Sequence, residues 1–89
     1  MSEENVVFEN DRVRVSRVRV EPGETHEGRQ RSDRVLVYMT DAHQVRSEAE
    51  QDGEEIRHGT GDVVWREASQ AEIRNLGGTP IETLIVEIK

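Results

Sequence analysis

Two arginines, Arg29 and Arg31, are the side chains in this sequence best spaced to bind a ligand together. Residues two apart in an extended strand face the same way, so both guanidiniums would point to one side. A guanidinium has no lone pair to offer a metal ion, but its N–H groups fork onto carboxylate or phosphate oxygens. The pair therefore predicts an anion pocket. The other interpretation places both at a solvated rim, paired with Glu27, Glu67 or Glu72.

Few side chains in the sequence could move a proton at neutral pH. His26 is a candidate general base, and Tyr38 is a second candidate for proton transfer; no catalytic residue is assigned beyond these two. His43 and His58 are expected on surface strands, and no two histidines have the i, i+2 or i, i+4 spacing of metal ligands. The chain has no cysteine, which excludes disulfides, zinc–thiolate sites and thiol catalysis.

Composition and charge narrow the class of protein further. The 89 residues predict one domain over residues 1–89, and a domain of this size buries only about 60% of its unfolded surface, which favours a homodimer. The net charge of −7 argues against binding to nucleic acid or to an anionic membrane. No apolar run is long enough to cross a membrane, and the first residues lack the pattern of a signal peptide, so we expect a cytoplasmic protein.

The elements that must position these side chains have the pattern of strands, and no segment has the pattern of a helix. Short apolar runs alternate with turn residues at close intervals, which is typical of an all-β fold closed as a barrel or double-sheet roll. Residues 34–40 are apolar on both faces and are expected at the centre of a sheet. The other expected strands cover residues 6–8, 12–21, 43–48, 54–58, 63–65, 71–75 and 81–88.

The second of these strands changes the phase of its apolar residues. Val13 and Val15 share one side of the strand, whereas Val18 and Val20 share the other side. Because side chains alternate strictly along a regular strand, this slip predicts a β-bulge or bend at residues 16–17.

A hairpin is predicted later in the chain, where residues 43–48 and 54–58 are expected to pair around residues 51–53. The acidic residues around this hairpin are expected to form a solvated face. They are Glu48, Glu50, Asp52, Glu54 and Glu55.

Two segments carry a resemblance to a known family. The first begins at Pro22-Gly23 and continues, after five residues, with Arg29-Gln30-Arg31. It is similar to the first motif of the cupin family, in which a glycine is followed by five residues, a histidine, any residue, a second histidine and then a glutamate. Both histidine positions are arginines here, and the glutamate position falls on Val35 or Leu36.

The second segment resembles the second cupin motif and follows the first in the expected order. The run Gly61-Asp62-Val63-Val64-Trp65 matches the glycine, aspartate, hydrophobic pair and aromatic residue of that motif. Its closing asparagine matches Asn75 in Asn75-Leu76-Gly77. The histidine of the motif falls on Ala71, or on Glu72 if the register shifts by one residue.

The resemblance covers about residues 13–87 and implies an all-β fold, a small single-domain cupin β-barrel of the double-stranded β-helix or jelly-roll type. Arginine and alanine stand at the positions that hold the metal in the family, so we expect no metal site and no cofactor. The pocket that the resemblance implies would be lined by the candidate ligand-binding residues Arg29, Arg31, Leu36, Tyr38, Trp65 and Ala71.

The leading functional hypothesis is a metal-free, cupin-like binding or accessory protein that holds a small anionic molecule in its barrel. The alternative is a metal-independent cupin enzyme, an isomerase, epimerase or lyase that acts on a small carboxylate or phosphate. It would use His26 or Tyr38 for proton transfer and would anchor its substrate with Arg29 and Arg31. Two further hypotheses are a metalloenzyme with His26 and Glu72 as unusual ligands and a purely structural dimer.

Overall fold

The computed structural model describes residues 2–48 and 51–89, and these form nine β-strands and no helix. The all-β prediction is therefore confirmed. No helix in this part of the chain could cross a membrane. The strands are β1 (Glu3–Glu9), β2 (Val13–Val20), β3 (Thr25–His26), β4 (Arg34–Tyr38), β5 (Ala42–Glu48), β6 (Glu54–His58), β7 (Val63–Arg66), β8 (Ala71–Asn75) and β9 (Ile81–Ile88).

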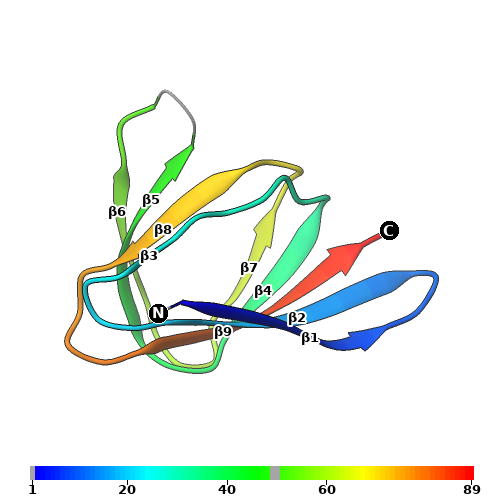
Figure 1. Ribbon diagram of the computed structural model, residues 1–89, viewed down its shortest axis with the longest axis horizontal. Coiled ribbons are helices and arrows are strands. Elements are labelled where there is room, and N and C mark those ends of the chain that lie inside the picture. The colour runs from blue at the N-terminus through cyan, green and yellow to red at the C-terminus, as the bar shows by residue number, and fades with distance from the viewer. Residues whose placement is uncertain (1, 49–50) are drawn as a thin grey trace.

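The strands form two antiparallel sheets that lie against each other (Figure 1). The five-stranded sheet has the order β1-β2-β9-β4-β7, and the four-stranded sheet has the order β3-β8-β5-β6. The chain crosses repeatedly from one sheet to the other, as in a double-sheet roll. As predicted for residues 34–40, β4 lies inside its sheet, between β9 and β7.

Strand β9 is the central strand of the larger sheet and sets the direction of its side chains. Ile81, Thr83, Ile85 and Glu87 are all buried, whereas the residues between them are only partly covered. This alternation has the period of two that a strand imposes. Glu87 therefore points into the space between the sheets, together with three neighbours that carry no charge.

The predicted bulge at residues 16–17 of β2 is wrong. The register between β2 and β9 runs without interruption from Val13, opposite Ile88, to Val20, opposite Ile81. The irregularity lies instead on β1, between Val6 and Phe8. Val18 and Val20, at one end of β2, face the interior, whereas Val13 and Val15, at the other end, face the outside. The apolar residues therefore change sides along a strand that stays regular.

The smaller sheet confirms the predicted hairpin, because β5 and β6 pair in antiparallel register from residues 42–46 to residues 54–58. Three of its acidic residues are exposed, namely Asp52, Glu54 and Glu55, and Glu50 lies outside the described residues. His26 belongs to the two-residue strand β3 and pairs with Ile73.

Only six hydrophobic side chains of the described residues are buried: Val18, Val20, Tyr38, Ala42, Ile81 and Ile85. A comparable number of buried side chains are polar or charged. The amide of buried Asn75 shows how one of them is accommodated. Its Nδ2 donates to the carbonyl oxygens of Val20 (2.9 Å) and Thr79 (2.8 Å), and its Oδ1 accepts from the backbone N–H of Gly77 (2.8 Å). Asn75 thus joins three backbone segments.

Replacing Asn75 tests this role. We expect Asn75→Ala to lower the free energy of unfolding by about 3 kcal/mol, because it leaves buried backbone groups without partners. Urea unfolding at neutral pH measures the change. Asn5→Ala, at an exposed position of β1, is the matched control and should have little effect. Equal losses in the two variants would contradict the assignment.

Candidate functional site

A cavity of about 60 Å³ lies between the two sheets. Its polar lining consists of four arginines with Tyr38 and Gln44, and no carboxylate of the described residues belongs to it. Its apolar lining is Leu36, Ala71, Ile73 and Ile85. The four arginines are Arg31, Arg34, Arg46 and Arg66.

Strand geometry explains why guanidiniums converge on this space. Arg34 lies on β4 in the same parity as the inward residues Leu36 and Tyr38, and it stands opposite Arg66 of β7. Arg46 lies on β5 of the other sheet and pairs in register with Ile73. The cavity is therefore lined from both sheets, and its positive charge follows from strand parity rather than from one local motif.

Arg34 is the most strongly enclosed of these cations, with 4% of its surface exposed. Its guanidinium donates to the carbonyl oxygens of Ser32 and Glu67, both at 3.2 Å, and to the Oγ of Ser69 at 3.1 Å. Burial, followed by the charges of Arg31 and Arg46, lowers the pKa of Arg34 from its usual value. An arginine stays protonated at neutral pH even so, which leaves a buried positive charge.

Arg34 and Arg66 share a further property: neither makes an ion pair with an acidic residue in the part of the chain that the structure describes. Arg46 differs, because its Nη2 lies 3.1 Å from the Oε1 of Glu48. Enclosed cations without a counter-ion are costly, since charges are transferred from water into a less polar surrounding. The cavity therefore favours any anion small enough to enter.

Arg31 is neutralised within the protein. Its Nη1 lies 2.7 Å from the Oε1 of Glu87, and both side chains are almost completely buried. Its guanidinium also pairs with Glu4 of β1. Arg29 reaches the same Glu87 oxygen with its Nη2 at 2.5 Å, but 42% of the Arg29 side chain is exposed. The buried carboxylate of Glu87 thus forms ion pairs with both arginines. Glu4, on the edge strand β1, supplies a second carboxylate to the same cluster.

The structure places four of the six predicted ligand-binding residues in the cavity lining and the other two elsewhere. Arg31, Leu36, Tyr38 and Ala71 line the cavity. Arg29 lies at its rim, bound to Glu87, and Trp65 lies on the outside of β7 with 53% of its surface exposed. Whether any of them binds a ligand stays a prediction.

Sequence reasoning missed Glu4 and Glu87 as the partners of the arginine pair, for which it considered Glu27, Glu67 and Glu72. Glu87 carried a usable signal, because it has the parity of Ile81, Thr83 and Ile85 along a strand whose position was predicted correctly. Arg34 carried the same kind of signal, through its parity with Leu36 and Tyr38. Glu4 had none, since its partners come from distant parts of the chain.

The two candidate proton-transfer residues lie in different surroundings. His26 is hydrogen-bonded through Nδ1 to the Oγ of Ser2 (3.1 Å) and through Nε2 to Glu4 (3.2 Å), and it does not line the cavity. Tyr38 does line it, and its Oη accepts a hydrogen bond from the Nε2 of Gln44 at 3.0 Å. Burial raises the pKa of Tyr38, so its hydroxyl keeps its proton and can donate it to a ligand.

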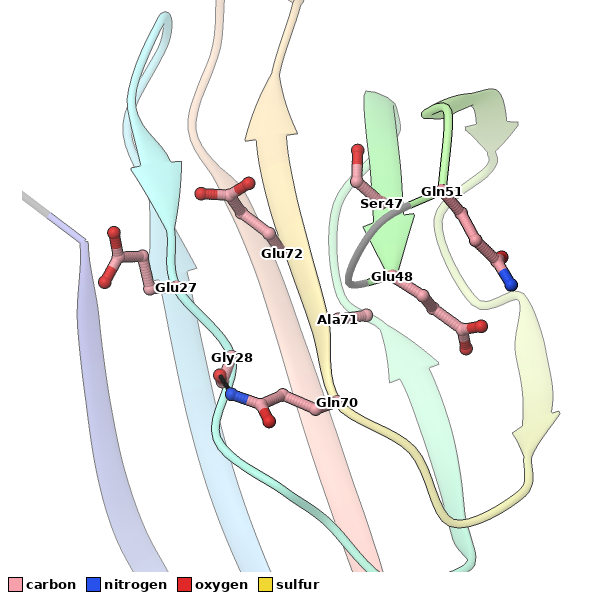
Figure 2. A pocket seen from close by; sticks show the side chains of 8 residues that line it. All are labelled: Glu27, Gly28, Ser47, Glu48, Gln51, Gln70, Ala71 and Glu72. Atoms are coloured by element: carbon pink, nitrogen blue, oxygen red, sulfur yellow. Dashed lines mark hydrogen bonds between the residues drawn. The ribbon is translucent and has the colours of Figure 1, made fainter.

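A larger surface groove of about 500 Å³ adjoins the cavity, and Ala71 lines both (Figure 2). Three carboxylates line this groove, those of Glu27, Glu48 and Glu72, and no cation does. Its size exceeds that of the cavity, but its charge repels anions. Another groove, of about 320 Å³, shares Arg46 and Arg66 with the cavity, and Glu48 and Glu67 also line it, so the charges of its lining balance.

The residues at the metal-binding positions of the cupin motifs do not fit a metal ion. Arg29 and Arg31 offer no lone pair, and Ala71 offers no donor atom. The described residues contain no group of three histidine, cysteine, aspartate or glutamate side chains that could hold a metal. Glu72, the alternative position, lines the outer groove rather than the cavity.

The ion pairs of Glu4 make a pH-dependent contribution to stability. The hydrogen bond with His26, assisted by Arg31 and Arg29 and opposed by burial, lowers the pKa of Glu4 from 4.5 to about 2. Because the folded-state pKa is the lower one, this contribution is present above pH 4.5 and is lost as the pH falls toward 2.

We therefore expect Glu4→Gln to destabilise the protein by roughly 2 kcal/mol at pH 7 and by much less near pH 3. Urea unfolding at both pH values measures the two differences. The matched control is Glu3→Gln, at the neighbouring exposed position. A deficit of Glu4→Gln that did not shrink on acidification would contradict this account.

Comparisons with known proteins agree with the fold. No protein-family model matches the chain, and neither does any curated protein. Among solved structures, a cupin domain of Bordetella pertussis Tohama I has 26% sequence identity and a TM-score of 0.89, and the match covers 99% of this chain and 93% of that one.

Two further structures are similar at lower identity. An RmlC-like cupin family protein of Methanocaldococcus jannaschii, with a double-stranded β-helix fold, has 13% identity and a TM-score of 0.78, over 99% of this chain and 80% of that one. A protein of Thermotoga maritima described as a predicted oxalate decarboxylase has 19% identity and a TM-score of 0.70, over 98% and 79% of the two chains. The two sheets and the match to these structures show that the chain has the cupin fold of the double-stranded β-helix type.

Proposed function

We propose that this chain is a small binding protein that takes up an anion of a few heavy atoms in its arginine-lined cavity, without a metal ion and in the cytoplasm. The observation that carries the proposal is the excess of positive charge inside: four guanidiniums surround about 60 Å³, and Arg34 and Arg66 have no acidic partner among the described residues. A bound anion would offset this charge with charge-assisted hydrogen bonds of about 1.5–3 kcal/mol each.

The size of the cavity restricts the ligand. A volume of about 60 Å³ corresponds to roughly two water molecules. Formate, nitrate, bicarbonate and acetate are of the matching size and geometry, because each presents planar oxygens to a guanidinium fork. Tyr38 of β4 and Gln44 of β5 add neutral polar groups from the two sheets, and Leu36 and Ile85 add apolar lining.

A metal-independent enzyme is the second candidate, and Tyr38 is the observation that favours it. Its hydroxyl reaches the cavity with its proton retained, so it could donate a hydrogen bond to a bound substrate. The cavity lining offers no partner that could act as a base, because its other polar groups are guanidiniums and an amide. Binding is therefore the better supported function.

Thermal unfolding in the presence of small anions tests the binding site. We expect about 10 mM formate, acetate, nitrate or bicarbonate to raise the Tm by roughly 5 °C for the best ligand, since a ligand stabilises the state that binds it. Arg34→Gln and Arg66→Gln should abolish most of this shift. Arg66→Gln changes a partly exposed side chain, so it tests the site even if the more deeply buried variant folds poorly.

Two arginines outside the cavity serve as controls for that experiment. Arg74→Gln removes one exposed positive charge from the outer side of β8, and Arg29→Gln removes the one at the rim. Both variants should keep the anion-induced shift. The proposal fails if no anion raises the Tm of the unaltered protein, or if Arg74→Gln loses the shift as fully as Arg66→Gln does.

Glu87 gives an independent test, because it is the buried carboxylate that limits the positive charge of the interior. We expect Glu87→Gln to lower the free energy of unfolding by about 3 kcal/mol, since Arg31 then keeps only Glu4 as an acidic partner. Anions should restore more stability to this variant than to the unaltered protein. Urea unfolding with and without acetate measures both effects, and equal responses to acetate would contradict the proposed site.

A further inference from the structure

The groove of about 320 Å³ that shares Arg46 and Arg66 with the cavity, which we call the edge groove, lies along β7, an edge strand of the five-stranded sheet. Successive side chains of a strand point to opposite sides, so Trp65 and Arg66 reach this groove from the two faces of β7. Arg46 lies on β5, so both sheets contribute to it. The rest of its lining consists of Glu48, Glu67, Ala68 and Ser69.

Ser69 lies at the border between the edge groove and the cavity. Its Oγ accepts hydrogen bonds from the Nη2 of Arg34 at 3.1 Å and from the Nη2 of Arg46 at 3.4 Å, and both arginines line the cavity. Its backbone pairs with that of Arg31, a third arginine of the cavity, through two N–H···O hydrogen bonds of 2.9 and 3.1 Å. The edge groove is thus the space into which a molecule bound by these guanidiniums can extend.

The two spaces differ in what they can hold. The cavity, of about 60 Å³, has room for a group of a few atoms such as a carboxylate. The edge groove, of about 320 Å³, falls within the range of roughly 300–1,000 Å³ that is typical of small-molecule sites. A ligand that fills both therefore places a small anionic end in the cavity and its larger part in the groove.

Ion pairing leaves one positive and one negative charge of the edge groove without a partner. Arg46 and Glu48 neutralise each other, with their Nη2 and Oε1 atoms 3.1 Å apart. Arg66 and Glu67, in contrast, form no ion pair with any residue that the structure describes. Arg66 lines the cavity as well as the groove, whereas Glu67 lines the groove alone. The unpaired positive charge therefore lies toward the cavity and the unpaired negative charge lies away from it.

Trp65 adds a second reason for a cation in the edge groove. The face of an indole ring attracts cations more strongly than that of any other aromatic side chain. Half of Trp65 is exposed, so its ring is accessible to a ligand. The net charge of −7 opposes the approach of a free anion, but it does not oppose a molecule that carries both signs of charge.

We propose that the ligand of this protein is a small amino carboxylate. Its carboxylate enters the arginine-lined cavity, and its ammonium group lies in the edge groove beside Trp65 and Glu67. This inference rests on the anion site proposed above and adds the chemical class of the molecule that carries the anion. Formate and acetate then correspond to the carboxylate end of the ligand, because the volume of the cavity limits only the end that enters it.

Two series of compounds at neutral pH test the amino group. One is glycine, β-alanine, 4-aminobutyrate and 5-aminopentanoate, and the other is the carboxylates of equal carbon number without the amine. We expect the best amino carboxylate to bind about fivefold more tightly than its matched carboxylate, as measured by the rise in Tm. Its chain length reports the distance between the two charged subsites.

Tryptophan fluorescence locates the bound ligand, because Trp65 is the only tryptophan of the chain. The best amino carboxylate should move the emission maximum to shorter wavelength, since it covers an indole ring that is half exposed to water. Acetate should raise the Tm and leave the emission unchanged, because it ends inside the cavity. An amino carboxylate that binds without any change in emission would overturn the proposed position of the ammonium group.

Glu67→Gln tests the ammonium subsite. It should reduce the ratio between the two dissociation constants, for the amino carboxylate and for its matched carboxylate, from about five to near one. Because both constants are measured on the same variant, a general loss of stability cancels from the ratio. Glu72→Gln is the matched control, since Glu72 is another exposed carboxylate but lines the larger groove beside Ala71. It should keep the ratio of the unaltered protein.

The outcomes separate this inference from the anion site on which it rests. If acetate raises the Tm but no amino carboxylate binds more tightly than its matched carboxylate, the anion site stands and the amino carboxylate is wrong. If neither series raises the Tm, both proposals fail. If Glu72→Gln removes the preference and Glu67→Gln keeps it, the ammonium group lies in the larger groove, which overturns the assignment to the edge groove.

Discussion

The buried ion pair between Arg31 and Glu87 is the interaction on which the interior of this protein depends. Glu87 lies on the central strand of the larger sheet, so it fixes a negative charge where guanidiniums from several strands converge. It holds Arg31 and Arg29 at once, and Glu4 adds a second carboxylate from the edge strand. Without it, Arg31 would keep only Glu4 as an acidic partner. The remaining excess of positive charge is what suits the cavity to an anion.

The same fold places polar and apolar residues in an unusual arrangement. Charged and amide side chains occupy much of the interior, and they are tolerated because hydrogen bonds or ion pairs accompany most of them, as for Asn75 and Arg34. Several apolar side chains, such as Val63 and Trp65, lie exposed on the outside of the five-stranded sheet instead. In an 89-residue chain these two features are linked, because there are few apolar residues to distribute.

Relative to the cupin motifs, this chain keeps the residues that shape the backbone and changes those that would hold a metal. Gly23 and Gly61 both adopt positive φ angles, 77° and 89°, which favour glycine at these turns. Asn75 ties three backbone segments together. These roles are structural and persist without any ligand. At the motif's histidine positions, by contrast, guanidiniums face carboxylates from β1 and β9, so the site has the chemistry of ion pairs.

The sequence by itself determined the all-β class, the position of nearly every strand and the similarity to cupins, because alternation and turn residues are local signals. It also showed that two arginines would replace metal ligands. Only the tertiary structure decided that Glu4 and Glu87 neutralise them and that Arg34, Arg46 and Arg66 join Arg31 around one cavity. Those contacts connect residues far apart in the chain, and their distances depend on the register and packing of two sheets. No local pattern encodes that geometry.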